Sequence, residues 1–221
     1  KYIELGNEFY FDVSNYKRVF PSGADYAQTA SEWIVAIKQE FPAAKIALVG
    51  VAPKPKDSIR EQNWQKSLLN SAMYQADAVT LHLYNGHGLN SQIDSNSTYP
   101  FFSSEEVQLI LGQPFRSWQK LQNNDQLKLI PDNKQIWITE YNLFENVFGK
   151  KNRDKQQRVM GSWTHGLYAL TMSLLFLEDS RIAIACNHVL TGNSRFAAIL
   201  ANKGSFINPS DEDFRVKPKS L

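Results

Sequence analysis

The chain has little cysteine, almost no net charge and no long apolar run, and each of these shortages excludes a class of protein. Among its 221 residues only Cys186 is a cysteine, so no internal disulfide can form. Lysine and arginine together number 24 against 22 acidic residues, and a formal charge of +2 provides no electrostatic surface for nucleic acid. No apolar run approaches the roughly 20 residues that a helix needs to cross a bilayer. We therefore expect neither nucleic acid nor a membrane as a partner.

Signature motifs of several enzyme classes are also missing from the sequence. No Gly-rich phosphate loop follows the first strand-like segment, which argues against the common nucleotide-binding fold. There is no His-Glu-x-x-His string and no Gly-x-Ser-x-Gly elbow, and the four histidines show no metal-ligand spacing. These absences argue against zinc and serine hydrolases, and we expect the protein to act without a metal or a cofactor.

Strand-like and helix-like segments alternate along the chain, in which 43% of residues are hydrophobic. A chain of this length and composition can bury one core, so we expect a single domain over residues 1–221. The alternation predicts an α/β fold with parallel strands, either a doubly wound open sheet or part of a (β/α)8 barrel. The expected strands are residues 2–6, 45–51, 78–84, 135–140 and 181–186; the expected helices are 26–41, 62–74, 105–121 with a break at Pro114, and 154–177; a long loop is expected over 85–104.

Two of the expected strands end in a glutamate. Glu8 closes the string Gly-Asn-Glu after the first strand, and Glu140 follows the apolar run at residues 135–139. Paired carboxylates at strand ends suit glycosidic bond cleavage, in which one acid protonates the leaving oxygen and one carboxylate attacks carbon. Each glutamate also has a plainer interpretation: Glu8 as a loop cap or a partner of Arg18, and Glu140 as an exposed charge at a strand end.

These strings resemble those of the large clan of retaining (β/α)8-barrel glycoside hydrolases. That clan carries an Asn-Glu pair at the end of strand four, a His-x-Tyr string near the end of strand six and a glutamate at the end of strand seven. Here the matching residues are Asn7 with Glu8, His82 with Tyr84, and Glu140. The glutamates are 140 − 8 = 132 positions apart, or three steps of about 44 residues, which exceeds the ~30 that one βαβ unit needs. Within the clan, the Gly-Asn-Glu string is most similar to those of the arabinofuranosidase and heparanase-like glucuronidase branches.

The resemblance implies that the chain is the C-terminal part of one (β/α)8 catalytic domain, an incomplete TIM barrel that supplies strands four to eight with their helices. The sequence starts with Lys1 immediately before a strand, which fits a fragment or a processed product. An N-terminal segment or a separate chain would then complete the barrel. A secreted or periplasmic location fits this class of enzyme.

The resemblance also implies a role for each candidate residue. Glu8 is the expected acid/base and Glu140 the expected nucleophile, and Tyr84 would hold Glu140 by a hydrogen bond. Asn7 would bind a sugar hydroxyl beside the anomeric carbon, although asparagine also makes turns readily. The remaining expected substrate-binding residues are His82, Tyr141, Asn142 and His188. For His82 and Tyr84, ordinary core packing is the alternative.

The sequence therefore predicts a retaining glycoside hydrolase that cleaves a polysaccharide or oligosaccharide by double displacement. A non-catalytic carbohydrate-binding or scaffold remnant of the same fold is the main alternative. An unrelated α/β domain with coincidental glutamates is the third. The sugar and the linkage do not follow from these residues, because specificity depends on loops and hydroxyl contacts.

Overall fold

The structure is a computed structural model that places most of the chain, in two compact units. It describes residues 1–52, 54, 56–69, 72–86, 103–143, 162–188, 191–192, 199–200 and 217–218. The first unit comprises residues 1–82, 120–139 and 179–185, and the second comprises residues 83–119, 140–178 and 186–221. The expected loop at 85–104 lies largely outside the described residues.

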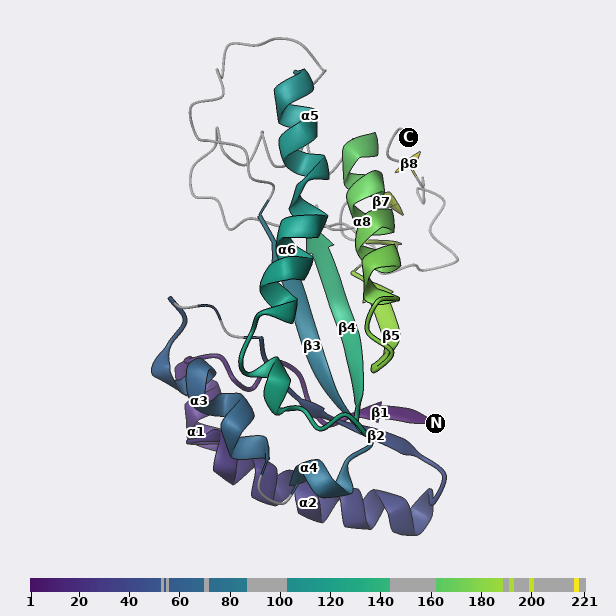
Figure 1. The fold of residues 1–221 in the computed structure, drawn as a ribbon. Coiled ribbons are helices and arrows are strands. Elements are labelled where there is room, and N and C mark those ends of the chain that lie inside the picture. Colours follow the sequence, from purple (N-terminus) through teal and green to yellow (C-terminus); the bar gives the residue numbers. More distant parts are fainter. Residues whose placement is uncertain are drawn as a thin grey trace. The chain divides into compact units, whose positions relative to one another are not determined.

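The main sheet has five parallel strands whose order in space equals their order in the chain (Figure 1). The strands are β1 (Tyr2–Glu4), β2 (Lys45–Val49), β3 (Ala78–Asn85), β4 (Gln135–Leu143) and β5 (Ile182–Asn187). Tyr2 pairs with Lys45, and Ala47 pairs with Ala78. A doubly wound sheet reverses its strand order at a switch point, and this sheet does not. The order β1-β2-β3-β4-β5 therefore favours the alternative, a partial barrel.

Four helices of the first unit follow β1 and β2 in the chain: α1 (Ser14–Val19), α2 (Gly23–Glu40), α3 (Ile59–Leu68) and α4 (Ala72–Gln75). The two longer helices start where the sequence supplies capping boxes, with Ser22 facing Asp25 and Ser58 facing Glu61. The expected helix at 62–74 was wrong as one element, because α3 ends at Leu68 and α4 begins at Ala72. The short helix α1 was not predicted.

Tyr26 and Trp64 attach α2 and α3 to the end of β2. Their rings stack with centroids 5.3 Å apart, and the Trp64 indole donates to the Val49 carbonyl at 2.8 Å. The Tyr26 hydroxyl accepts from Val49 N at 2.8 Å and donates to the Leu5 carbonyl at 3.1 Å. Complete burial raises the pKa of this hydroxyl. The ends of β1 and β2 are therefore fixed by buried hydrogen bonds.

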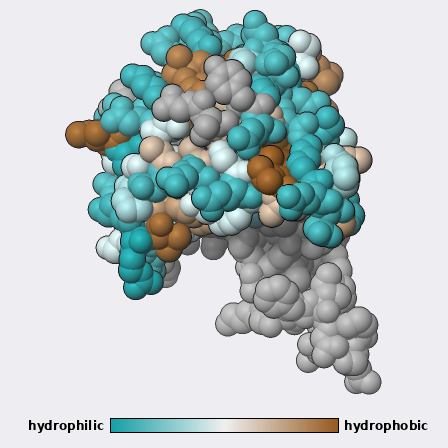
Figure 2. Space-filling model, turned by 90° about the horizontal axis from the view of Figure 1, so that it is seen from below, coloured by the Kyte–Doolittle hydropathy of each residue, from teal (hydrophilic) through white to brown (hydrophobic). Residues whose placement is uncertain are grey.

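The surface seen from below is mostly hydrophilic (Figure 2). Its hydrophobic residues appear as separate brown spots rather than as one continuous patch. Scattered apolar residues of this kind are normal on a folded protein.

The second unit contains α5 (Ser104–Leu111), most of α6 (Gln113–Gln122) and α8 (Trp163–Phe176). Pro114 is the second residue of α6, where a missing N–H is tolerated, so the predicted break is confirmed. The helix expected over 154–177 is confirmed over Trp163–Phe176, but it is not one continuous helix, because Ser162 is extended. Its expected start at residue 154 lies outside the described residues. None of the described helices is long and apolar enough to cross a membrane.

The remaining elements are short. A 3-10 helix, η1 (Leu127–Leu129), precedes β4 in the first unit, and β6 (Thr191–Gly192), β7 (Ile199–Leu200) and β8 (Lys217–Pro218) form a small sheet in the second.

Candidate active site

The string Gly6-Asn7-Glu8 makes a sharp turn after β1. Gly6 has φ 116° and Glu8 has φ 52°, so both adopt backbone conformations that L side chains rarely populate. A Cβ on Gly6 would lie 2.0 Å from Cε2 of Phe9, so only glycine fits. For Glu8 the left-handed conformation costs on the order of 1–3 kcal/mol, and strain of this kind concentrates at functional sites. Asn7, between them, is exposed.

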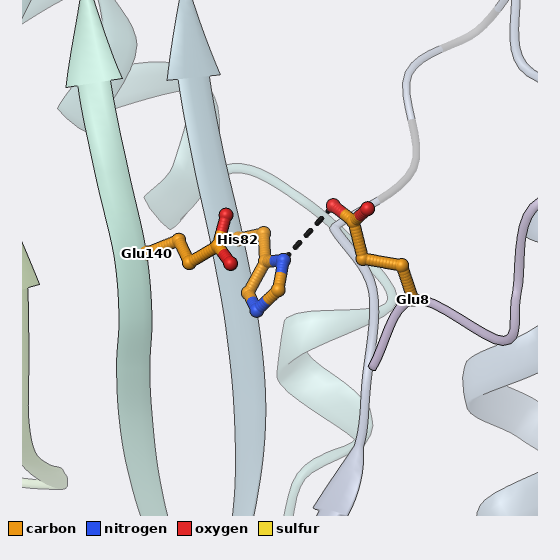
Figure 3. A group of neighbouring side chains, drawn as sticks. All are labelled: Glu8, His82 and Glu140. Atoms are coloured by element: carbon orange, nitrogen blue, oxygen red, sulfur yellow. Dashed lines mark hydrogen bonds and ion pairs between the residues drawn. The ribbon is translucent and has the colours of Figure 1, made fainter. Parts of the chain in front are cut away.

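Glu8 is held by a histidine on β3. Its Oε1 lies 2.9 Å from Nδ1 of His82, as Figure 3 draws, and accepts a hydrogen bond of 3.3 Å from the Tyr10 hydroxyl. The Nε2 of His82 lies 3.1 Å from Oγ1 of Thr139 on β4. Only 4% of the His82 side chain is exposed. The Glu8 carboxylate thus contacts His82 rather than Arg18, and these contacts define its orientation.

Glu4 adds a second carboxylate near His82. Its Oε1 lies 3.9 Å from Nε2 of His82 and accepts a 2.7 Å hydrogen bond from Thr80, which precedes His82 by two positions on β3. The sequence alone does not predict the contacts of His82 with Glu8 and Glu4, because they depend on the pairing of β1 with β2 and of β2 with β3.

In the second unit, Glu140 is held by Tyr84 and His188. The Tyr84 hydroxyl donates to Oε2 of Glu140 at 2.5 Å, so the hydrogen bond expected from the sequence is present. Nδ1 of His188 lies 2.5 Å from the same hydroxyl and 3.5 Å from Oε2 of Glu140. The Glu140 side chain is 24% exposed and that of His188 is 40% exposed, so both remain accessible to a ligand.

Tyr141 and Asn142, both expected to bind substrate, are buried. The Tyr141 hydroxyl lies 2.6 Å from Oγ of Ser173, and its ring packs edge-on against Phe176 with centroids 5.1 Å apart. Both partners lie on α8. These contacts favour a structural role for Tyr141.

Asn142 belongs to a second set of polar contacts that the sequence did not reveal. Its Oδ1 lies 2.5 Å from Nε2 of His165 on α8 and accepts from Leu143 N at 2.7 Å. Its Nδ2 donates to the carbonyl of His188. Nothing in the sequence distinguishes His165 from an ordinary core histidine of an apolar helix.

Neither unit taken alone, over the residues that the structure describes, gathers three His, Cys, Asp or Glu side chains able to hold a metal ion. The polar groups within each unit instead form hydrogen-bonded sets around one glutamate: His82, Tyr10 and Thr139 near Glu8 in the first unit, and Tyr84 and His188 at Glu140 in the second.

No family model and no curated protein sequence matches the chain. Solved structures with a similar fold include three arabinofuranosidases. The α-L-arabinofuranosidase from Thermotoga maritima, in an arabinose complex, is 18% identical with a TM-score of 0.51, covering 89% of this chain and 35% of that one. The family 51 α-L-arabinofuranosidase from Bifidobacterium longum is 14% identical with a TM-score of 0.53, covering 81% and 36%. The GH51 arabinofuranosidase from Xanthomonas axonopodis pv. citri is 16% identical with a TM-score of 0.52, covering 90% and 38%.

The chain thus spans little more than a third of each of these structures. At 14–18% identity the likeness concerns the fold alone. All three are TIM-barrel glycoside hydrolases, and the parallel sheet with consecutive strand order is consistent with part of such a barrel. The chain has a glycoside hydrolase-like α/β fold.

Proposed function

We propose that the protein is a retaining glycoside hydrolase in which Glu8 is the acid/base and Glu140 the nucleophile. One observation carries the proposal: two side chains of β3, His82 and Tyr84, each hold one of the two glutamates. Residues two apart on a strand share a face of the sheet. The proposal is that the two carboxylates held in this way serve one double-displacement site, which needs an acid/base and a nucleophile about 5–5.5 Å apart.

The hydrogen bonds support a separate task for each carboxylate oxygen of Glu140. Tyr84 occupies Oε2 of Glu140, so Oε1 is the oxygen that bonds to the anomeric carbon while the bond from that carbon to the leaving oxygen breaks. Glu8 gives its proton to the leaving oxygen in this step. Water then attacks the same carbon, Glu8 takes the water proton, and Glu140 leaves as a carboxylate. Asn7, exposed beside Glu8, contacts a sugar hydroxyl.

We further propose that β1 to β5 correspond to barrel strands four to eight, so that residues 1–221 are the C-terminal part of one catalytic domain. A preceding segment or a separate chain supplies strands one to three. The three similar structures are named as arabinofuranosidases, which makes α-L-arabinofuranosides the first substrates to test. The protein acts without a cofactor.

The test uses the full-length protein with a panel of aryl glycosides that includes an α-L-arabinofuranoside. We expect hydrolysis of at least one member, loss of turnover by more than about a thousandfold in Glu140→Gln, and a first-formed product with the anomeric configuration of the substrate by NMR. Near-normal activity of Glu140→Gln, or an inverted product, would overturn the proposal.

Glu8→Ala separates the two roles. A dinitrophenyl leaving group needs no protonation, so this variant should form the glycosyl-enzyme readily and then stall. Azide should restore turnover and give a glycosyl azide with the substrate's configuration, because a small anion replaces activated water. Oligosaccharide binding without turnover of any substrate would instead favour the carbohydrate-binding alternative.

A further inference from the structure

A chain of hydrogen bonds runs from the interior of α8 to Glu140, entirely within the second unit. His165 on α8 contacts Asn142 on β4, Asn142 contacts the His188 backbone after β5, and the His188 ring contacts Tyr84. Tyr84 in turn contacts Glu140. Strands β3 and β4, the residue that follows β5, and helix α8 are linked in this way to a single carboxylate oxygen.

The donors in this chain are fixed by counting protons. A tyrosine hydroxyl has one proton, and Tyr84 uses it toward Oε2 of Glu140. The Tyr84 oxygen must therefore accept from His188, which places a proton on Nδ1 of that ring. If Nδ1 carried no proton, its lone pair would face the Tyr84 oxygen and compete with Oε2 of Glu140 for the tyrosine proton. The Nδ1–H tautomer of His188 thus decides where the tyrosine proton points.

The position of His188 is itself held from two sides. Its backbone N donates to the Tyr141 carbonyl at 3.1 Å, and its carbonyl accepts from Nδ2 of Asn142. Asn142 cannot turn over, because its Oδ1 already accepts from Leu143 N at 2.7 Å and lies 2.5 Å from Nε2 of the buried His165. A buried amide that is hydrogen-bonded through both its oxygen and its nitrogen has one orientation.

We propose that His188 is a positioning residue for Glu140: its Nδ1–H fixes the hydroxyl of Tyr84, and Asn142 with His165 hold His188 in place. The inference rests on the proposed function and deepens it. It assigns His188 and Asn142 to the support of the nucleophile rather than to substrate contact. The consequence is that losing the Nδ1 donor slows the attack by Glu140 without weakening substrate binding.

Two substitutions at position 188 differ in the atom they retain. The amide nitrogen of asparagine overlays Nδ1 of histidine, whereas the amide nitrogen of glutamine overlays Nε2. We therefore expect His188→Asn to keep kcat within about threefold of the wild type, and His188→Gln to lower it by about tenfold or more with KM changed less than twofold. Cys186→Ser, at an exposed position two residues earlier, is the matched control and should change neither constant.

Comparing substrates with good and poor leaving groups shows which catalytic step His188→Gln slows. Because the loss acts on Glu140 and not on protonation by Glu8, His188→Gln should lose the same factor with a dinitrophenyl and with an alkyl glycoside. Equal kcat in His188→Asn and His188→Gln, a loss confined to KM, or a loss only with the poor leaving group would each overturn the proposal.

A spectroscopic measurement decides the hydrogen bonds independently of turnover. In the wild type, long-range ¹H–¹⁵N NMR correlations should show His188 as the Nδ1–H tautomer. This preference should be lost in Tyr84→Phe and should weaken in His165→Leu. His165→Gln keeps a donor toward Asn142 and should preserve the preference. A wild-type Nε2–H tautomer would overturn the proposal even in an active enzyme. Complete inactivity of the wild type would overturn the proposed function, and the tautomer would still show whether the hydrogen-bond chain exists.

Discussion

The Tyr84 hydroxyl donates a 2.5 Å hydrogen bond from β3 to Oε2 of Glu140 on the neighbouring strand β4. The donor is short and rigid, because tyrosine has only two side-chain torsions and its ring stands on a strand. A neutral donor of this kind stabilises an ionised carboxylate and restricts its rotation. It leaves the other carboxylate oxygen for chemistry.

Tyr84→Phe keeps the ring but removes the donor to Glu140 and, with the same oxygen, the contact with Nδ1 of His188. Because hydrogen bonds to charged groups contribute roughly 1.5–3 kcal/mol, we expect kcat to fall by about 10- to 100-fold with little change in KM. Steady-state kinetics with the best aryl glycoside measures the effect. Tyr2→Phe deletes the same atom from a residue that is 68% exposed and should leave both constants unchanged. An unaltered kcat in Tyr84→Phe would show that Glu140 does not depend on this contact.

His82 contacts Glu8 through Nδ1 and Thr139 through Nε2, so its two nitrogens can be tested separately. His82→Asn retains a donor near Glu8, whereas His82→Gln retains one near Thr139. If His82 orients Glu8 for proton donation, the glutamine variant should lose about tenfold in kcat/KM with an alkyl glycoside and much less with a dinitrophenyl glycoside. The asparagine variant should lose less than the glutamine variant. The same loss with both leaving groups would contradict this role.

The sequence predicted the elements whose signals are local. Apolar runs flanked by polar residues predicted β2, β3 and β4, and Pro114 predicted the division between α5 and α6. The link between Tyr84 and Glu140 was also expected, because a resemblance supplied both strings. The apolar runs and the proline depend only on neighbours along the chain, whereas the link between the two distant residues came from the resemblance.

Contacts that depend on the pairing of distant elements could not be predicted. His82 was expected to bind substrate, and only the packing of β3 beside the turn after β1 shows that it holds Glu8. Asn142 was expected to bind substrate, and only the contact of β4 with His165 on α8 shows that it is buried. The left-handed conformation of Glu8 was equally hidden, because glutamate is not a residue that favours it.

Two glycines offer a matched test of the turn before Glu8. Gly6→Ala places a methyl group 2.0 Å from Phe9 at φ 116°, and we expect a loss of about 3 kcal/mol in the free energy of unfolding. Gly166→Ala, within α8, meets no atom within 4 Å and should stabilise by about 0.5–1 kcal/mol, because alanine favours helix. Urea denaturation measures both changes. Equal effects of the two substitutions would show that the turn at Gly6 is not constrained.

Asp77 is the clearest source of acid-dependent stability in the first unit. Its carboxylate, 20% exposed, accepts from Ile46 N at 3.0 Å and lies 3.0 Å from Lys45 Nζ and 3.1 Å from Lys38 Nζ. Burial opposes ionisation, but the three hydrogen bonds outweigh it and lower the pKa of Asp77 below its ordinary value of 3.8. The folded state therefore holds this proton more weakly than the unfolded state does.

A carboxyl group whose pKa is depressed on folding stabilises the protein above its unfolded pKa, and the contribution disappears as the pH falls through the folded pKa. We therefore expect Asp77→Asn to cost about 1–3 kcal/mol at pH 7 and the gap between variant and wild type to narrow steadily below about pH 4. Urea denaturation at pH 7, 5, 4 and 3 measures the gap. Asp125→Asn, at a fully exposed carboxylate paired with Lys128 three residues away, is the control and should change stability little at any pH. A gap that stays constant from pH 7 to pH 3 would mean that Asp77 contributes through its shape and not through its charge.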